Sequence, residues 1–398
     1  MVDSRRAPLA GVRVLDLSRV LAGPFCAQNL ADLGADVIKV ERPGSGDDTR
    51  AWGPPYLKDA QGNDTSESAY YISTNRNKRS IAVDLATPEG VAIVKKIASQ
   101  CDVLIENFKV DGLKQYGLDY DSLKAEIPSL VYCSITGFGQ TGPFASRPGY
   151  DFMIQGFGGL MSITGERDGM PGAGPQKAGV AVTDIITGLY AALAIMGALY
   201  ERKQSGLGQY IDLALLDCHI AMLANQNLNF MTSGEAPGRA GNAHQNVVPY
   251  QVFKAADGYL IVAVGNDSQF RAYCQIIGKP ELATDPRYQT NSQRIQNRDT
   301  LIPLLEEIML ERERDQWIAA FEKAGVPGGP IQTIDQVFAH PQVKSREIWR
   351  EVPHPVAGQS PTTASPMNFS ATPVQYTRHA PMLGEHTEEI LREFGIKP

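Results

Sequence analysis

One carboxylate stands near the start of a long apolar segment, where it could act as a nucleophile. Asp184 lies in AGVAVTDIITG (178–188), and the following run, rich in Ala, Leu, Ile and Met, predicts a buried helix to about Lys203. Taken alone, an aspartate there is more often a helix cap. The alternative is chemical: the helix N-terminus would keep the carboxylate ionised for attack, and neighbouring N–H groups would stabilise an oxyanion on a substrate carbonyl.

Other motifs could bind a ligand, but each has a plainer interpretation. Tyr150 and Asp151 precede another predicted helix, where Asp151 could simply be a cap. The loop RPGSGDD (42–48) could cradle a phosphate, but it lacks the patterns of dinucleotide sites and P-loops, so a solvated turn is favoured. The basic cluster NRNKRS (75–80) could also meet phosphates, although most such clusters are solvated.

The histidines and cysteines argue against metal or disulfide chemistry. No HxxxH or HExxH pair occurs among the six His, and the five Cys include no CxxC, so we expect no metal site and a reducing, cytoplasmic environment. His219 lies on an apolar predicted helix and is interpreted as a core residue. Cys26 is interpreted as a packing residue, since no His is adjacent in sequence to activate it.

The elements that must position these residues alternate between strand and helix. Residues 12–18, 22–34 and 35–41 read as strand, helix and strand, and the pattern is repeated at 80–85, 87–100 and 101–108. Further strands are predicted at 130–139 and 210–216. This alternation predicts an α/β fold with a mostly parallel sheet covered on both faces.

The length of 398 residues predicts two folded regions. We expect a large domain over 1–224, a smaller α+β domain over 225–330 with a hairpin turning at Asp257-Gly258, and a linker and C-terminal return to the large domain over 331–398. The return would end in a helix near 386–394.

Composition narrows the possible partners. The chain is 43% hydrophobic and 20% charged with a net charge of −7, and its basic residues are scattered, so neither nucleic acid nor an anionic membrane surface is an expected partner. The N-terminal segment lacks the apolar stretch of a signal peptide, and no segment holds about 18 uninterrupted apolar residues. We therefore expect no membrane segment.

Several blocks in a fixed order resemble the class III CoA transferases, the family of formyl-CoA transferase and carnitine CoA transferase, nearly from end to end. The blocks are LDLSRVLAGPF (15–25), LGADVIKVERPGSGDDTR (33–50), NRNKRSIAVDL (75–85), DVLIENF (102–108), SITGFGQTGP (134–143), GYD (149–151), the Asp184 segment and PMLGEHT (381–387). The resemblance implies a Rossmann-like large domain built from both chain ends, a smaller domain, and two ring-like monomers interlocked in a homodimer. Acyl-CoA and carboxylic acids would be substrates, with no permanently bound cofactor.

The resemblance also assigns residues. Asp184 matches the catalytic aspartate of the family, which reverses the preference for a cap. Positions that contact CoA in the family are matched by Leu21, Ala22, Arg42, Val83, Asn107, Phe108 and Lys109, and the GYD block adds Tyr150 and Asp151.

The chain departs from the formyl-CoA transferase pattern at three places. Leu21 replaces a Gln, Gln115 stands where a basic phosphate-contacting residue is expected, and NAHQNVVPY (242–250) replaces a multi-glycine loop. Formate and oxalate are therefore poor expected substrates. His244 and Gln245 in the replaced loop are candidate substrate contacts, although ordinary loop residues are the plainer interpretation.

Three further blocks, including GVAVTDIITGLYA (179–191), look most like the succinyl-CoA:glutarate transferases, which exchange CoA between dicarboxylic acids. The implied mechanism passes through a mixed anhydride and an aspartyl-CoA thioester on Asp184. One alternative is an α-methylacyl-CoA racemase, but those enzymes place a His before the Asp of the GYD block, and a tyrosine, with an ordinary pKa of about 10, is a poor base near neutrality. Another is a CoA-binding protein without catalysis, in which Asp184 is only a cap.

Overall fold

The computed structural model describes residues 6–397, which form two compact units. The first unit comprises the chain up to Leu160, Ala178–Gly234 and the chain from Gln342, and the second comprises Met161–Lys177 and Glu235–Pro341. These bounds differ from the expected domain limits at 161–177 and 331–341, which pack with the second unit, and at 225–234, which pack with the first. Residues 1–5, which begin the segment interpreted as lacking a signal peptide, and Pro398 lie outside the described residues.

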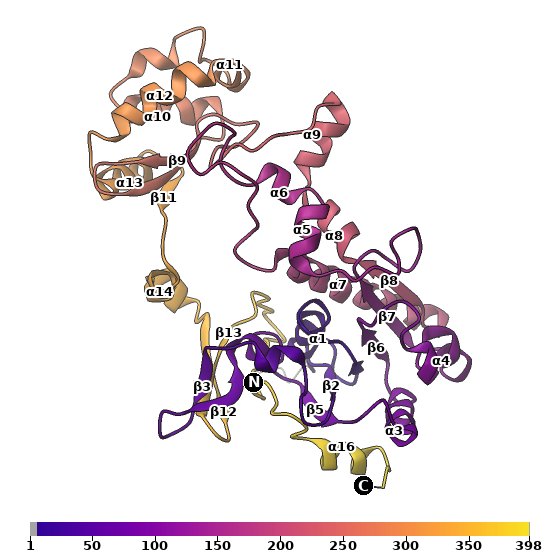
Figure 1. Ribbon diagram of the computed structural model, residues 1–398. Coiled ribbons are helices and arrows are strands. Elements are labelled where there is room, and N and C mark those ends of the chain that lie inside the picture. Colours follow the sequence, from indigo (N-terminus) through magenta and orange to yellow (C-terminus); the bar gives the residue numbers. More distant parts are fainter. Residues whose placement is uncertain (1–5, 398) are drawn as a thin grey trace. The chain divides into compact units, whose positions relative to one another are not determined.

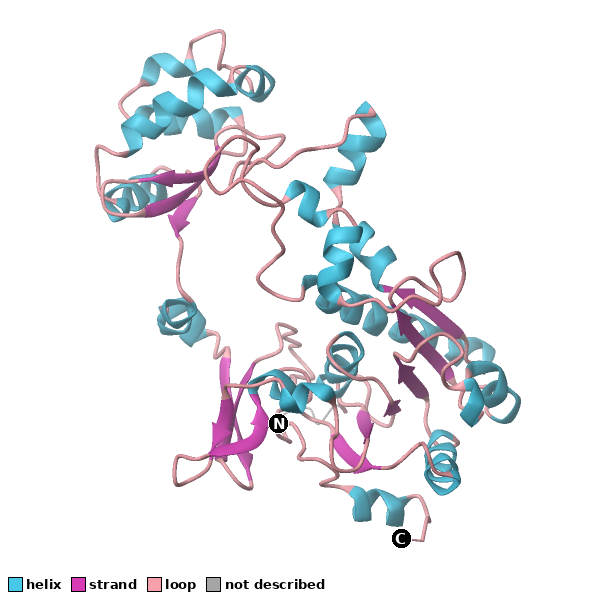
Figure 2. Cartoon of the chain, viewed as in Figure 1, coloured by secondary structure: helices cyan, strands magenta, loops and turns pink. Residues whose placement is uncertain are grey.

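A parallel sheet forms the centre of the first unit (Figures 1 and 2). Within the described residues it has six strands in the order β5-β2-β1-β6-β7-β8. The strands are β1 Arg13–Asp16, β2 Asp36–Glu41, β5 Arg79–Ala82, β6 Val103–Glu106, β7 Val131–Thr136 and β8 Tyr210–Ala214. Every recorded pairing between them is parallel, so the predicted α/β fold with a parallel sheet is confirmed. The strand order reverses between β1 and β6, as in doubly wound nucleotide-binding folds.

Helices cover both faces of this sheet. Alternate residues of one strand point to opposite faces, so Val14 and Val103 belong to one core cluster and Leu15 and Leu104 to another. The first cluster packs under α1 Ala22–Asp32, α5 Asp151–Phe157, α7 Val182–Ser205 and α8 Leu215–Met222. The second packs under α3 Pro88–Ala98, α4 Tyr120–Glu126 and α16 Thr387–Glu393.

Helix α7 is the longest described helix, and its first turns meet the start of α1. By length and composition it could cross a membrane, although half of its most apolar window is buried inside the protein. Ala191, Ala192 and Ile195 pack in the core beside α1. Gly188 permits the closest approach, because a Cβ there would lie 2.7 Å from the carbonyl oxygen of Ala22. The start of α1 is thereby brought against the turn of α7 that follows Asp184.

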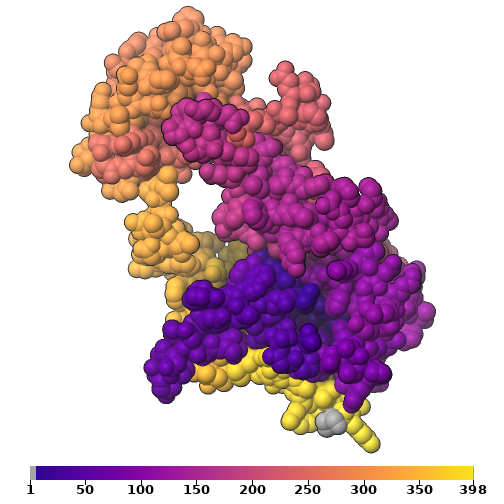
Figure 3. Space-filling model, in the orientation of Figure 1, coloured from indigo at the N-terminus to yellow at the C-terminus, as the bar shows by residue number. Residues whose placement is uncertain are grey.

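The C-terminal segment packs against the first sheet. Arg79 of β5 pairs with Glu389 and Glu393 of α16 at 2.9 and 2.7 Å, and the His386 N–H donates to the Ser80 carbonyl. The hairpin of β12 Trp349–His354 and β13 Gly358–Thr363 precedes this helix. In the space-filling view the C-terminal residues, in yellow, lie against N-terminal residues, in indigo (Figure 3).

The second unit is a smaller α+β body with its own core. Its antiparallel sheet contains β9 Tyr250–Lys254, β10 Tyr259–Ala263 and β11 Gly328–Pro330, and the predicted hairpin at Asp257-Gly258 is confirmed. Trp317, Phe321 and Phe253 are buried in this core. Its helices are α10 Asp267–Ile276, α11 Asn291–Gln296, α12 Arg298–Met309, α13 Arg314–Lys323 and α14 Ile334–Ala339.

Shorter elements complete the chain. They are η1 Asp48–Ala51, β3 Tyr56–Lys58, β4 Asp64–Ser68, α2 Ala69–Ile72, η2 Lys114–Tyr116, α6 Leu160–Ile163, α9 Asn225–Ser233, η3 Pro280–Ala283 and α15 Pro341–Ser345. Residues 161–177 join the second unit through the Gly241 N–H, which donates to the Gly165 carbonyl, and through Arg239, whose Nε donates to the Glu166 carbonyl.

Candidate active site

A cavity of about 410 Å³ lies in the first unit at the carboxyl ends of β1, β6 and β7. This is the point where the strand order reverses, and ligands of doubly wound folds bind at such a point. Seven of the residues proposed from the sequence line it: Leu21, Ala22, Asn107, Phe108, Lys109, Tyr150 and Asp184. The topology therefore gathers segments that are far apart in the sequence around one carboxylate.

The remaining predicted site residues do not line this cavity. Arg42 is exposed in the loop after β2, and Val83 is buried in the core on the other face of the sheet. Asp151 acts on α7 instead, as described below. His244 and Gln245 belong to the second unit, where their carbonyl groups accept hydrogen bonds from Arg298. Their roles in ligand binding stay predictions.

Asp184 is the third residue of α7 and is not a cap. Ala181 occupies the N-cap position, and among the described residues no hydrogen bond influences the Asp184 carboxylate. Burial, followed by the charge of Asp151, raises the pKa of Asp184 to about 7. The position of this carboxylate at a helix N-terminus predicts that it is kept ionised. The pKa shifts in the opposite direction, because burial and then the charge of Asp151 disfavour the ionised form of Asp184.

Asp151 occupies N–H groups at the start of α7. Its Oδ1 accepts from the N–H of Thr183 at 2.8 Å and of Asp184 at 3.3 Å, and its Oδ2 accepts from Gln155 Nε2 at 2.6 Å. Tyr150, not Asp151, holds the N-cap position of α5. Asp151 was predicted to cap the helix that follows it in the sequence, α5. It does act as a cap, but it accepts from the first N–H groups of α7 instead.

The loop between β1 and α1 is held from several sides. Asn107 clasps Arg19, accepting from its N–H at 2.9 Å and donating to its carbonyl at 2.7 Å. The next residue, Val20, has a φ of 71°, which is unfavourable for a β-branched side chain, and its N–H donates to Asp47 at 3.2 Å. A strained turn at the cavity wall is therefore fixed by side chains from two neighbouring loops.

Two buried lysines hold this loop and the start of α1 by hydrogen bonds to their carbonyl groups. Lys39 pairs with Asp47 at 2.9 Å and donates to the Ser18 carbonyl, while Lys78 pairs with Asp16 at 3.0 Å and donates to the Pro24 carbonyl. Burial opposes ionisation of Asp47, but Lys39 and the Thr49 N–H lower its pKa to about 2. Burial lowers the pKa of Lys78 to about 8 despite Asp16.

The cluster NRNKRS is accordingly neither solvated nor free for a phosphate. Lys78 is bound as above, Arg76 pairs with Asp32, and Arg79 pairs with Asp36, and all three basic side chains are buried. The sequence interpretation of a solvated cluster was wrong, because the acids that neutralise it come from β1, α1 and β2.

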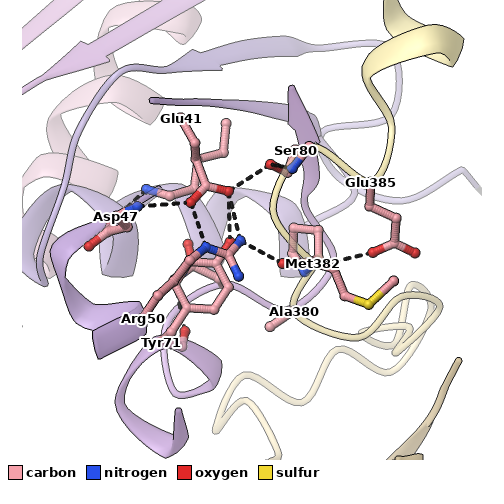
Figure 4. A network of polar contacts seen from close by, with 12 residues as sticks. Glu41, Asp47, Arg50, Tyr71, Ser80, Ala380, Met382 and Glu385 are labelled. Carbon is pink, nitrogen blue, oxygen red and sulfur yellow. Dashed lines mark hydrogen bonds and ion pairs between the residues drawn. The ribbon is translucent and has the colours of Figure 1, made fainter. Parts of the chain in front are cut away.

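A second buried network ties the loop after β2 to the C-terminal segment (Figure 4). The Arg50 guanidinium donates twice to Glu41, at 2.8 Å each, lies over the Tyr71 ring and donates to the Pro381 carbonyl at 2.8 Å. Glu41 also accepts from the Asp47 N–H and from Ser80. This network fixes Asp47, and through Asp47 the strained Val20.

Sequence reasoning missed two basic residues of the cavity wall, Arg19 and Arg147. The Arg147 guanidinium lies 4.6 Å from the centre of the Phe144 ring. Gln115 also lines the cavity, so Arg147 supplies positive charge to a wall where a basic residue was expected at 115. The available signal was its place two residues before the GYD block.

His219 and Cys26 lie in the core, as expected. The His219 Nδ1 is 2.7 Å from Thr183 Oγ1, and burial lowers the pKa of this imidazole. Cys26 is fully buried, which raises the pKa of its thiol. In the part of the chain that is described, no group of three or more His, Cys, Asp and Glu could hold a metal ion.

Comparisons with known proteins identify the family. The model of CoA-transferase family III matches residues 9–387. The chain is 51% identical to the succinate–glutarate CoA-transferase of Agrobacterium fabrum, over 98% of this chain and 97% of the relative, and 45% identical to the human succinyl-CoA:glutarate CoA-transferase, over 97% and 86%. A crystal structure of a CAIB/BAIF family protein from Brucella suis superposes with a TM-score of 0.85 at 49% identity, covering 98% of this chain and 100% of that one. The chain therefore belongs to CoA-transferase family III.

Proposed function

We propose that this enzyme moves CoA from succinyl-CoA to a dicarboxylate such as glutarate, with Asp184 as the nucleophile. The observation that carries the proposal is a buried carboxylate without a hydrogen-bond donor, placed at the wall of the cavity where doubly wound folds bind ligands. The relatives whose names specify glutarate support the acceptor.

The reaction begins when the ionised Asp184 attacks the thioester carbonyl of the donor. The C–S bond breaks, CoA leaves as the thiolate, and a mixed anhydride joins Asp184 to the donor acyl group. The thiolate then attacks the Asp184 carbonyl carbon and releases the donor carboxylate, which leaves an aspartyl-CoA thioester. The acceptor carboxylate displaces the thiolate from this thioester, and the thiolate finally attacks the acceptor carbonyl, which regenerates free Asp184.

The cavity residues bind CoA and hold its thioester in line with Asp184. Lys109, Arg19 and Arg147 supply positive charge for the phosphates, and Leu21, Ala22 and Phe108 supply apolar contact. A carboxylate is a weak nucleophile, so this fixed alignment must contribute much of the acceleration. Arg42 and Val83 are proposed as further CoA contacts, and His244 and Gln245 as contacts of the acceptor.

The same proposal extends to the assembly. Two ring-like monomers, each with a Rossmann-like domain and a smaller domain, interlock in a homodimer. The enzyme works in the cytoplasm and needs no bound metal or permanent cofactor. It has no nucleic-acid or membrane partner. Sedimentation equilibrium tests the dimer. A mass of two chains that persists on dilution supports interlocking, whereas a monomer contradicts it.

The function is tested with purified protein and succinyl-CoA as donor. Glutarate, oxalate, formate, itaconate and carnitine serve as acceptors, and mass spectrometry identifies each product. We expect glutaryl-CoA from the wild type and none from Asp184→Asn. Asp217→Asn, in the first turn of α8 and exposed, is the matched control and should keep its activity.

A donor-only experiment tests the intermediate. Wild-type protein incubated with succinyl-CoA and no acceptor should gain the mass of one CoA less one water, and Asp184→Asn should gain nothing. Epimerisation of a 2-methylacyl-CoA without any CoA transfer would overturn the proposal in favour of a racemase.

A further inference from the structure

We propose that Asp151 is a positioning residue that sets the reactivity of Asp184, by placing a second negative charge beside the Asp184 carboxylate while occupying N–H groups of the helix start that would otherwise stabilise it. The inference rests on the proposed role of Asp184 as the nucleophile and deepens it. It concerns the strength of the nucleophile and not the identity of the substrates.

The geometry fixes Asp151 against the first turn of α7. Its carboxylate receives the N–H groups of Thr183 and Asp184 at 2.8 and 3.3 Å. Gln155, one turn later on α5, donates to the same carboxylate at 2.6 Å and is itself fully buried. The Gln155 side chain also accepts from the Ala178 N–H at 2.8 Å, so one residue orients Asp151 and holds the segment that leads into α7.

The electrostatic consequence is opposite to the usual effect of a helix start. Free N–H groups at a helix N-terminus stabilise a nearby anion. Here a neighbouring carboxylate takes up two of those groups and adds its own charge beside Asp184. Burial and this charge together raise the pKa of Asp184 to about 7.

Other ionisable groups around α7 do not account for this effect. The groups on its packed neighbours, besides Asp151 itself on α5, are Cys26 and Asp32 of α1, Tyr132 and Cys133 of β7, Tyr210 and Asp212 of β8, and Asp217, Cys218 and His219 of α8. Asp32 is paired with Arg76, and burial lowers the pKa of His219. Arg19, Lys109 and Arg147 line the cavity. Burial, followed by the charges of Asp184 and Asp151, raises the pKa of Tyr70 in α2. Of all these charged groups, only Asp151 shifts the pKa of Asp184 in addition to burial.

A more basic carboxylate suits the proposed chemistry. In the attack on the thioester, the Asp184 carboxylate replaces the CoA thiolate on the acyl carbon, and the ordinary pKa of a thiol is about 8.5. The closer the carboxylate comes to the thiolate in proton affinity, the less unfavourable this exchange becomes, and the nucleophile itself gains reactivity. The cost is protonation below about pH 7, where the enzyme loses its nucleophile.

The test compares Asp151→Asn with Asp151→Glu. Asparagine keeps an oxygen that can accept from the two N–H groups but removes the charge, whereas glutamate keeps the charge and changes the length. For Asp151→Asn we expect the acid limb of kcat/KM to move to lower pH by about one unit, and kcat on the alkaline plateau to fall roughly threefold for each unit if the Brønsted coefficient is about 0.5. The KM for succinyl-CoA should stay unchanged. In Asp151→Glu the acid limb should stay near pH 7 even if kcat falls.

The matched control is Asp119→Asn. Asp119 also closes a helix start, accepting from the Ser122 N–H at 3.2 Å, but it does not line the cavity. A purely structural effect of replacing a capping carboxylate by an amide would change only the stability of the two Asn variants and would leave both pH profiles in place. That outcome, an unmoved acid limb in Asp151→Asn, would overturn the inference.

A measurement without turnover separates this inference from the proposed function. In protein labelled with ¹³C at the aspartate carboxyl carbon, the NMR signal absent from Asp184→Asn should titrate near pH 7 in the wild type and at lower pH in Asp151→Asn. If the wild type transfers no CoA while these midpoints differ, the proposed function fails and the tuning stands. If the wild type transfers CoA but has the same titration midpoint as Asp151→Asn, the proposed function stands and the proposed effect of Asp151 on Asp184 is refuted.

Discussion

Gly188 and Ala22 touch at a point where no side chain fits. A Cβ on Gly188 would lie 2.7 Å from the carbonyl oxygen of Ala22 and 3.2 Å from the Cys26 nitrogen, and both of these atoms belong to the backbone of α1. Backbone cannot move aside as a flexible side chain can. This contact holds the start of α1, with Leu21 and Ala22 of the cavity wall, against the turn of α7 that follows Asp184.

Gly188→Ala should therefore lower both stability and activity. Alanine favours a helix over glycine by about 1 kcal/mol, so a variant with no clash would be more stable. Gly197→Ala in the same helix meets nothing within 4 Å and is the matched control. We expect thermal denaturation to show a lower Tm for Gly188→Ala and an equal or higher Tm for Gly197→Ala. A rise in both would show that α1 and α7 can separate at little cost.

The sheet and its order of elements were within reach of the sequence. Hydrophobic periodicity placed β1, α1, β2, α3, β6, β7 and β8 within a few residues of their observed bounds, because each buries a regular apolar pattern in one layer. The resemblance added the residues that share the cavity, since block order carries over between relatives. Periodicity alone indicated neither Asp184 nor Asn107 as part of a site.

The partners of the charged residues were out of reach. The pairing of Lys78 with Asp16 joins residues 62 positions apart, and the contact of Arg50 with Pro381 spans 331. A local window shows only a basic cluster at 75–80, so that cluster was interpreted as solvated, and it shows no partner for Arg50, which lies just beyond the Gly-rich loop at 42–48. The direction of the Asp184 pKa shift was also out of reach, because burial sets it first and the charge of Asp151, which lies 33 residues earlier, adds to it.

Replacing Asp184 by Asn should stabilise the protein at high pH. The pKa of this carboxyl is raised from an ordinary 3.8 to about 7 in the folded state, so its ionised form is disfavoured by folding. The penalty is absent below about pH 4, grows as pH rises through that window, and is complete above about pH 7, where it amounts to a few kcal/mol at most.

Chemical denaturation at pH 8 and pH 4 checks this prediction. Asp184→Asn should exceed the wild type in free energy of unfolding at pH 8, with little difference at pH 4. A difference of the opposite sign at pH 8 would mean that Asp184 is stabilised in its ionised form. Active sites often lower the stability of a protein for the sake of activity, so Asp184→Asn should be more stable than the wild type at pH 8 and should also be inactive.

Asn107→Asp should weaken CoA binding by loosening the loop before α1. The carboxylate can still accept from the Arg19 N–H but cannot donate to the Arg19 carbonyl, so one of two hydrogen bonds is lost. A lost hydrogen bond costs about 1 kcal/mol, or several-fold in affinity. We expect the KM for succinyl-CoA to rise by about that factor, measured under initial-rate conditions.

A control separates this effect from general damage. Asn63→Asp lies in an exposed turn of the first unit and should leave the KM unchanged. If Asn107→Asp lowers kcat with no change in KM, then the loop before α1 does not hold CoA. It instead aligns the thioester for the chemical step.

Arg147→Ala should raise the KM for acyl-CoA and make it less dependent on salt. Arg147 lines the cavity near Gln115, the uncharged residue at a position where the family resemblance implied a basic phosphate contact. An arginine that meets a phosphate loses that contribution gradually as ionic strength rises, because exposed charges are screened. The wild-type KM should therefore increase with salt more steeply than that of the variant. Lys124→Ala, on α4 and outside the cavity wall, controls for the loss of one positive charge. Parallel salt dependence in wild type and Arg147→Ala would assign the phosphate contact to Arg19 or Lys109 instead.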